Sequence, residues 1–219
     1  MSNRGKRNEE FEELAQEIFD KIMERNPHYG THFGLHQYDG ILPDGRLEKK
    51  QEDIRLAKKW IKKLKDFEGS ELSPENQFSR KLGLHILELD LFEEEEISNW
   101  KKDPAAPQVI GMSLFPLLKR NFAPIEERLE SINDRIGGIP DYLEQSKSKL
   151  EKPVAMWIDM ALESSANIRG LFDITKLAAE EAGMNDSFLE DLNSRIQQAK
   201  KSLKSYQEWL QEKKSEANE

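Results

Sequence analysis

The stretch that decides the fold class lies near the C-terminus, where residues 189–210 read LEDLNSRIQQAKKSLKSYQEWL. Its apolar residues recur at alternating intervals of three and four, which is the spacing of one face of an α-helix and not the period of two that a strand shows. Sustained over three heptads, this seam predicts a helix that packs at a shallow angle against its neighbours. The seam residues are Leu189, Leu192, Ile196, Ala199, Leu203, Tyr206 and Leu210.

The same helical spacing recurs along most of the chain towards the N-terminus. An apolar stripe runs through residues 11–23, and a second helix is predicted over 47–67. Ser73, followed directly by a proline, predicts a capped helix start. The helix after it carries apolar residues around most of its circumference between 78 and 92, which predicts a central, buried helix.

Proline and glycine residues mark where these helices begin and end. Pro27 ends the first helix and opens a short new turn, Gly137 is expected to end a helix, and Pro140 to start the next one. A longer helix is predicted from Pro153 to Gly183. Because no segment shows the alternation of a strand, the sequence predicts an all-α fold: a multi-helix bundle of about eight helices with Pro/Gly-rich connecting loops and no sheet.

The 219 residues are enough for one substantial hydrophobic core. We predict a single helical domain over residues 1–212, with N-terminal helices in 7–110 and C-terminal helices in 111–212 that end in the heptad-patterned helix. The polar tail, residues 213–219, is predicted to be disordered.

Composition excludes several classes of function. The chain has 33 basic and 42 acidic residues, a net charge of −9, which disfavours nucleic acid and anionic membrane surfaces as partners. It has no cysteine, so disulfides, thiol nucleophiles and thiolate metal sites are excluded. No apolar run approaches the roughly 20 residues that span a bilayer, and a cytoplasmic location is expected.

Three histidines at successive intervals of four are the most suggestive cluster of side chains. His28, His32 and His36 would line one face of an uninterrupted helix, where histidines can bind a divalent metal ion. However, Gly34 is expected to end the helix between them, and the stretch His32-Phe33-Gly34-Leu35-His36 lacks the glutamate of a zinc-peptidase motif. Both a structural or surface role and metal binding remain open for these residues.

Other polar residues have simpler interpretations. His85 lies within the apolar helix over 78–92 and is predicted to be a core histidine. Asp159 and Glu163 are one turn apart and are expected to lie on the hydrated side of an amphipathic helix. No catalytic triad and no glycine-rich phosphate loop can be assigned, so the sequence gives no catalytic or cofactor-binding residue.

Two stretches resemble a known family. Residues 26–44, NPHYGTHFGLHQYDGILPD, and residues 122–140, FAPIEERLESINDRIGGIP, are similar to two segments of the proteins grouped as domain of unknown function 885 (DUF885). The resemblance extends over nearly the whole chain. It singles out five residues as cleft or family-motif residues: Tyr38, Asp39, Asp44, Arg128 and Arg135.

Members of that family are typically more than twice this length and largely helical, and they look like zinc metallopeptidases of the gluzincin type with an H-E-x-x-H motif in the C-terminal half. This chain has no such motif. The resemblance therefore implies a truncated or partial protein: a non-catalytic N-terminal helical half that forms one wall of a substrate cleft. Zinc is implied for the longer relatives and no cofactor for this chain. The implied partners are a missing C-terminal catalytic half or a peptide substrate.

Two alternatives stay open beside this interpretation, and with them the question whether the chain is an enzyme. The chain could be a self-contained helical protein–protein interaction module that forms a homodimer through the last helix. It could also be a small metal-dependent hydrolase that uses His28 and His32.

Overall fold

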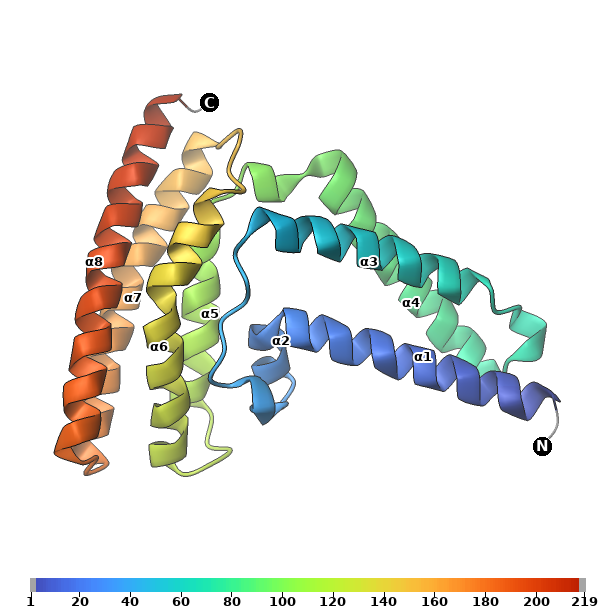
Figure 1. Cartoon of the computed structure of the whole chain (residues 1–219), viewed down its shortest axis with the longest axis horizontal. Helices are drawn as coiled ribbons and strands as arrows, with labels where there is room; N and C mark the ends of the chain where they lie inside the picture. Colours follow the sequence, from blue (N-terminus) through green and yellow to red (C-terminus); the bar gives the residue numbers. More distant parts are fainter. Residues whose placement is uncertain (1–2, 217–219) are drawn as a thin grey trace. The chain divides into compact units, whose positions relative to one another are not determined.

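The computed structural model describes residues 3–216 and divides the chain into two compact units. Unit 1 comprises residues 1–22 and 48–99, and unit 2 comprises 23–47 and 100–219. Within the described residues there are eight α-helices and no strand, which confirms the predicted all-α bundle (Figure 1). The boundary between the units differs from the predicted division between residues 110 and 111, because the helix after residue 105 packs with the C-terminal helices.

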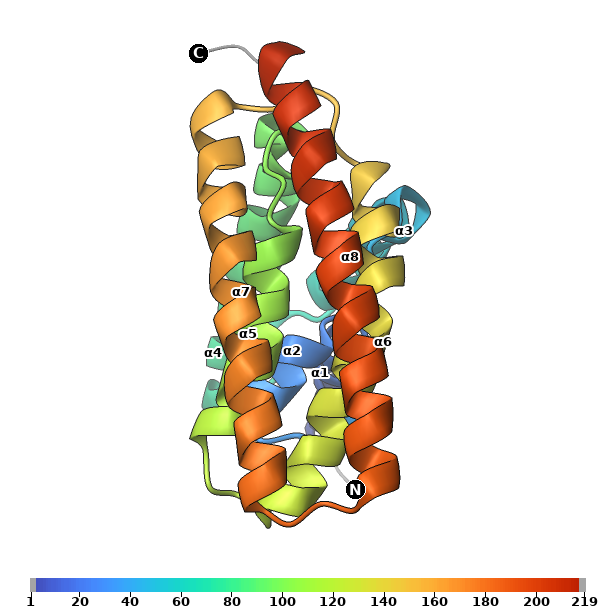
Figure 2. The ribbon, with the colours of Figure 1, turned by 90° about the vertical axis from the view of Figure 1, so that its left-hand side faces the viewer.

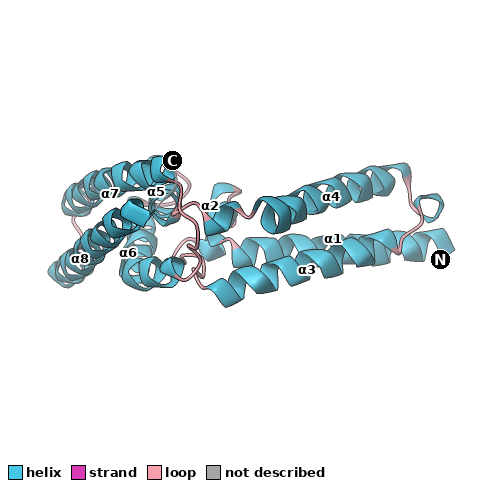
Figure 3. Cartoon of the chain, turned by 90° about the horizontal axis from the view of Figure 1, so that it is seen from above, coloured by secondary structure: helices cyan, strands magenta, loops and turns pink. Residues whose placement is uncertain are grey.

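Unit 1 consists of three long helices that lie side by side (Figure 3). They are α1 (Asn3–Arg25), whose last turn belongs to unit 2, α3 (Leu47–Lys65) and α4 (Pro74–Phe92). A short 3-10 turn, η2 (Gly69–Glu71), joins α3 to α4, and a π-helical turn, η3 (Glu93–Ile97), follows α4. Apolar residues that recur at helical spacing on each helix form the core. The buried members are Phe11, Leu14, Ile18, Trp60, Ile61, Leu64, Phe67, Leu72 and Leu87.

Helix α4 differs from its prediction. Its start is as expected, because the Ser73 hydroxyl accepts a hydrogen bond from the Asn76 main-chain N–H at 3.2 Å. However, Leu87 is its only buried apolar residue, and His85 is exposed and does not lie in a core. The three-helix unit offers one layer of partners, so only one face of α4 is covered, and the prediction of a central, buried helix is wrong.

Unit 2 is a four-helix bundle preceded by short helical turns. The turns are α2 (Pro27–His32) and η1 (His36–Tyr38), with a further 3-10 turn, η4 (Asn99–Lys101), ahead of the bundle. Around the bundle α5 packs beside α6, α6 beside α8, α8 beside α7 and α7 beside α5, and α2 packs against α5 (Figure 2). The bundle helices are α5 (Ala106–Lys119), α6 (Ile125–Lys147), α7 (Ala155–Glu181) and α8 (Asp186–Glu216).

The heptad seam that predicted the fold lies inside this bundle. Its residues from Leu192 to Leu210 are at most 1% exposed. Helices α6 and α7 cover the seam within the chain. Helix α8 also continues to Glu216, so residues 213–216 are helical and not part of a disordered tail; residues 217–219 lie outside the described residues.

Helix α6 runs uninterrupted through the glycines and proline that were expected to divide it. Gly137 does not end a helix and Pro140 does not start one, because both lie within Ile125–Lys147. The residues Ile132, Ile136 and Ile139 on its inner face are fully buried. Burial of this apolar face outweighs the helix-breaking tendency of a single proline, which costs about 3 kcal/mol.

None of the helices between residues 3 and 216 combines the length and the apolar character needed to cross a lipid bilayer.

Candidate functional site

The two arginines of the family motif lie on the buried side of α6. Arg128 and Arg135 are seven residues apart, which is two helical turns, so they lie on the same face. Arg128 is 6% exposed and Arg135 is fully buried. A fully buried guanidinium is unfavourable unless its N–H groups find acceptors and its charge is compensated. The residues around Arg135 must therefore supply hydrogen-bond acceptors and a compensating negative charge.

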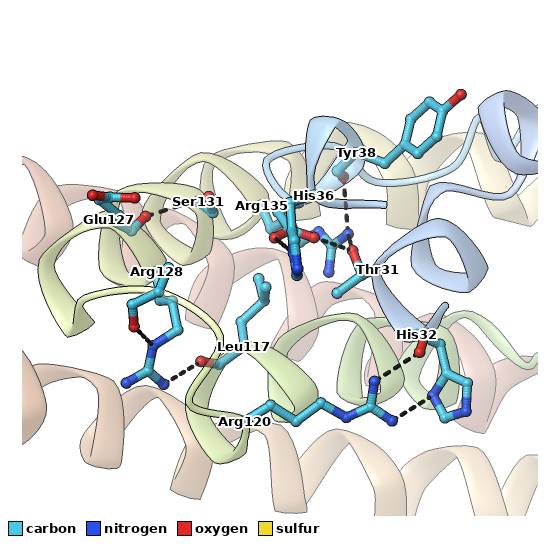
Figure 4. Close-up of polar contacts among 12 residues, drawn as sticks. Thr31, His32, His36, Tyr38, Leu117, Arg120, Glu127, Arg128, Ser131 and Arg135 are labelled. Atoms are coloured by element: carbon cyan, nitrogen blue, oxygen red, sulfur yellow. Dashed lines mark hydrogen bonds and ion pairs between the residues drawn. The ribbon is translucent and has the colours of Figure 1, made fainter. Parts of the chain in front are cut away.

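Arg135 donates to α2, to the segment between α2 and α3, and to α5. Figure 4 shows its contacts with Thr31 and Tyr38. Its Nη2 donates to the Thr31 hydroxyl at 2.6 Å and to the Tyr38 carbonyl at 3.0 Å, and its Nε donates to the Ile41 carbonyl at 3.1 Å. Its Nη1 donates to the Ser113 carbonyl of α5. One side chain thus joins three parts of unit 2.

Asp39 supplies the opposite charge. The carboxylate is 3% exposed, and its Oδ1 accepts from the Thr31 hydroxyl at 2.7 Å, so the threonine connects it to Arg135. Its Oδ2 lies 2.9 Å from Nδ1 of His36. Burial lowers the pKa of Arg135 to about 10, and Asp39 opposes that shift. The arginine therefore stays protonated at neutral pH, and the network is a buried ion pair bridged by a hydroxyl.

Arg128 performs a similar role at the end of α5. Its Nη1 donates to the Leu117 carbonyl at 2.9 Å and its Nε donates to the Ala123 carbonyl at 3.1 Å, while Nη2 reaches Oδ1 of Asn121 at 3.1 Å (Figure 4). The last carbonyls of a helix have no partner within the helix. Arg128 satisfies two of them, because its Nη1 also donates to the Leu118 carbonyl at 3.2 Å, and it holds the loop between α5 and α6.

The remaining motif residues shape the same segment. Figure 4 shows the Tyr38 ring pointing away from Arg135 while its carbonyl faces the guanidinium. The ring packs over Gly30, where a Cβ atom would lie 2.5 Å from Tyr38 Cδ2, so only glycine fits beneath it. Asp44 accepts from the Arg46 main-chain N–H at 3.0 Å and ion-pairs with the Arg46 guanidinium at 2.5 Å, which fixes the turn before α3.

The structure separates the three histidines. His28 is buried in α2, with its ring 4.2 Å from that of Tyr29. His32 is exposed at the end of α2, where Arg120 donates to its carbonyl at 2.7 Å. His36 lies in η1, beyond Gly34, which has a φ of +83° and ends α2 as expected.

These residues do not form a metal site. Among the described residues, no three histidine, aspartate or glutamate side chains are grouped so that they could hold an ion. His36 is engaged by Asp39 and stacks on the Phe122 ring at 3.9 Å between centroids. The side chains present in residues 3–216 therefore do not fit a zinc ion, and no step through one is assigned to them.

His28 makes the stability of the protein depend on pH. Burial, aided by the Arg135 charge, lowers its pKa from 6.5 to about 4, so the folded protein holds the neutral ring. The unfolded chain binds a proton near pH 6.5. Stability is therefore lost as the pH falls from 6.5 towards 4, by up to about 3 kcal/mol from this group. We expect a His28→Phe variant to show a flatter dependence of the unfolding free energy on pH over this window, measured by urea unfolding at a series of pH values.

A second variant controls for the general effect of acid. Phe33 is an exposed neighbour in the same part of the chain and carries no titratable group, so Phe33→Leu should leave the slope of the wild-type protein unchanged. If the free energies of unfolding of the wild type and of His28→Phe changed with pH in the same way, His28 would not be the titrating group.

Three of the five motif residues thus hold the fold from inside unit 2. Asp39, Arg128 and Arg135 are buried and bonded internally, whereas Tyr38 and Asp44 are partly exposed. Sequence reasoning missed most of their partners because three of the four acceptors of Arg135 are main-chain carbonyls, which any residue type supplies. The sequence offered one signal: two arginines spaced by seven on a helix with a buried apolar face.

Comparison with known proteins places this fold in a family. A model for a family described as "Bacterial protein of unknown function (DUF885)" matches residues 27–219. A solved structure described as that of "a putative lipoprotein of unknown function from Shewanella oneidensis" has a TM-score of 0.84 and 22% sequence identity. The match covers 94% of this chain and 38% of that chain. At that identity the likeness shows a shared fold. No curated protein matches.

Proposed function

Because this chain belongs to the DUF885 family of bacterial proteins of unknown function, we propose that it is the non-catalytic helical part of a metallopeptidase-like protein. In this proposal its helices form one wall of a substrate cleft. A separate zinc-binding half supplies the other wall and the chemistry. The partners of the chain are then that half and a peptide substrate.

The relative lengths of the proteins support this proposal. The chain spans 38% of the length of the solved protein that shares its fold. Most of that longer protein therefore lies outside the matched region. In addition, the sequence here has no H-E-x-x-H motif with which to build a zinc site of its own.

The observation that carries the proposal is an apolar face on two neighbouring helices of unit 2. Met112 and Phe115 of α5 are 51% and 53% exposed, and Met156 and Met160 of α7 are 63% and 53% exposed. Helices α5 and α7 pack beside each other (Figure 2). Exposed apolar patches of this kind mark interaction surfaces, and flexible methionines suit a surface that must accept varied side chains. This α5–α7 face is the wall that we propose for the cleft.

The experiment measures binding between this chain and the separately produced C-terminal half of a longer DUF885 protein by isothermal titration calorimetry. We expect binding that Phe115→Ser weakens at least ~10-fold, because it removes an aromatic anchor from the α5–α7 face. The matched control is Phe19→Ser in unit 1, which removes a phenylalanine that is 41% exposed and should leave the affinity unchanged.

Peptide hydrolysis provides the second measurement. The 219-residue chain alone, assayed on a mixed peptide library with and without added zinc, should show no turnover. Turnover by this chain alone, or equal loss of affinity in Phe115→Ser and Phe19→Ser, would contradict the proposal.

A further inference from the structure

Helix α4 of unit 1 exposes a continuous apolar stripe that takes no part in the core of unit 1. The side chains that face the core of unit 1 are Leu84, Leu87 and Leu91. At 100° per residue, the exposed apolar residues fall within an arc of roughly 120° on the opposite side of the helix. The stripe consists of Phe78, Leu82, Ile86, Leu89 and Phe92, which are between 47% and 68% exposed.

The stripe is nearly symmetric in sequence about His85. Phe78 and Phe92 lie seven residues before and after it, and Leu82 and Leu89 lie three before and four after it. Rotation by 180° about an axis at His85, perpendicular to α4, therefore places Phe78 opposite Phe92 and brings Leu82 within one residue of the position opposite Leu89. An isologous two-fold interface requires this kind of self-complementary surface.

Two side chains of opposite charge flank His85 beside the stripe at nearly equal distances along the sequence. Lys81 lies four residues before His85 and Glu88 lies three residues after it, and both border the same edge of the stripe. An antiparallel pair keeps this edge of both copies on the same side of the interface and brings Lys81 of each copy within one residue of the position opposite Glu88 of the other. A two-fold parallel pair would put the two edges on opposite sides of the interface, where these charges do not meet. Within its own chain Glu88 contacts Lys65 at 2.6 Å, and both of these side chains remain about half exposed.

The size of the stripe is adequate for a modest interface. Its five side chains expose roughly 450 Å² of apolar surface per copy, which is within the range of functional patches on monomers. With the bordering charged side chains it approaches the ~800 Å² per partner of a standard interface. We propose that two copies of this chain associate through α4, antiparallel about a two-fold axis at His85.

Site-specific cross-linking tests the register directly. The sequence has no cysteine, so a single introduced cysteine is the only thiol in the chain. A short bismaleimide should cross-link His85→Cys into a covalent dimer, because the two thiols lie beside the axis. Phe92→Cys is the matched control in the same stripe. In the antiparallel pair its two thiols are separated by about 21 Å along the helix and should not be joined.

Each pattern of cross-linking has one meaning. A dimer from His85→Cys alone supports the antiparallel pair. Equal cross-linking of both variants indicates parallel or non-specific association and overturns the proposal. Absence of cross-linking in both variants at high micromolar concentration also overturns it.

Sedimentation equilibrium of the full chain provides an independent test that distinguishes a specific dimer from non-specific association. Ile86→Glu should raise the dimer dissociation constant at least ~30-fold, since the two-fold axis introduces the charge twice. Lys81→Glu alone and Glu88→Lys alone should each weaken the dimer by ~3-fold or more, and the double variant should restore it.

Far-ultraviolet circular dichroism shows whether each variant is folded, and exposed positions should leave the helical signal unchanged. A wild-type protein that remains monomeric throughout the concentration range, or Ile86→Glu that associates as the wild type does, refutes pairing through α4. Binding of the C-terminal half in the calorimetric experiment is measured on a different face, so either proposal can fail without the other.

Discussion

Replacing Arg135 by methionine is expected to lower the free energy of unfolding by about 3–5 kcal/mol, the range found when one partner of a buried ion pair is removed. Methionine fills part of the space but donates no hydrogen bond. The variant leaves Asp39 as a buried charge without its counter-ion. It also leaves the carbonyls of Tyr38 and Ile41 without this donor. Urea unfolding followed by circular dichroism measures the loss.

Arg195→Met is the matched control for this prediction. Arg195 of α8 pairs with Asp134 and Asp191, both at 2.9 Å, but its side chain is 32% exposed. Each solvent-accessible ion pair contributes up to about 1 kcal/mol, so the control, which removes two, should lose no more than about 2 kcal/mol. If both variants lost similar amounts, the buried network would not be the element that holds unit 2 together.

Gly45→Ala is expected to destabilise the protein by about 2–3 kcal/mol through overpacking. A Cβ atom at this buried position would lie 2.9 Å from the main-chain oxygen of Tyr142 and 2.8 Å from Oγ of Ser146, both on α6. The helix backbone cannot yield as a flexible side chain does. The shift would also disturb the hydrogen bond from the Gly45 N–H to Oε1 of Gln145, which is 3.0 Å long. Thermal and urea unfolding measure the effect.

Gly111→Ala gives the opposite expectation and controls for the change of residue type. Gly111 lies within α5, and a Cβ atom there would have no neighbour within 4 Å. Alanine should stabilise the helix by about 0.5–1 kcal/mol, because glycine loses more backbone entropy on folding. If Gly45→Ala were as stable as the wild type, close packing of the loop on α6 would not be required.

Local patterns predicted the helices well where propensity and burial agree. The Ser73 cap, the new turn at Pro27 and the end of a helix near Gly183 all follow from the chemistry of one or two residues. The uninterrupted α6 could not be predicted in that way. Its glycines and proline disfavour a helix locally, and the buried isoleucines that outweigh them depend on the neighbouring helices being present.

The candidate site likewise combines features that local sequence predicts with features that depend on tertiary packing. The sequence singled out Asp39 and Arg135 through a family motif, but gave no reason for a charge at either position. The reason is that Thr31 and the carbonyls of the intervening segment converge on the guanidinium once that segment packs against α5 and α6. The histidines at intervals of four suggested a metal site, yet Gly34 directs His36 away from the helix that carries the other two.

The amino-acid sequence by itself determined that this protein is helical and where most of its helices begin and end, because spacing and caps are local properties of the chain. Only the tertiary structure decided which side of each helix is covered. The apolar residues of α4 are nearly as numerous as those of α8. Helices α6 and α7 enclose α8, whereas within unit 1 α4 has helices on one side alone. Burial depends on what packs against a residue and not on the residue itself, so the exposed stripe of α4 and the buried charge of Arg135 are properties of the folded arrangement.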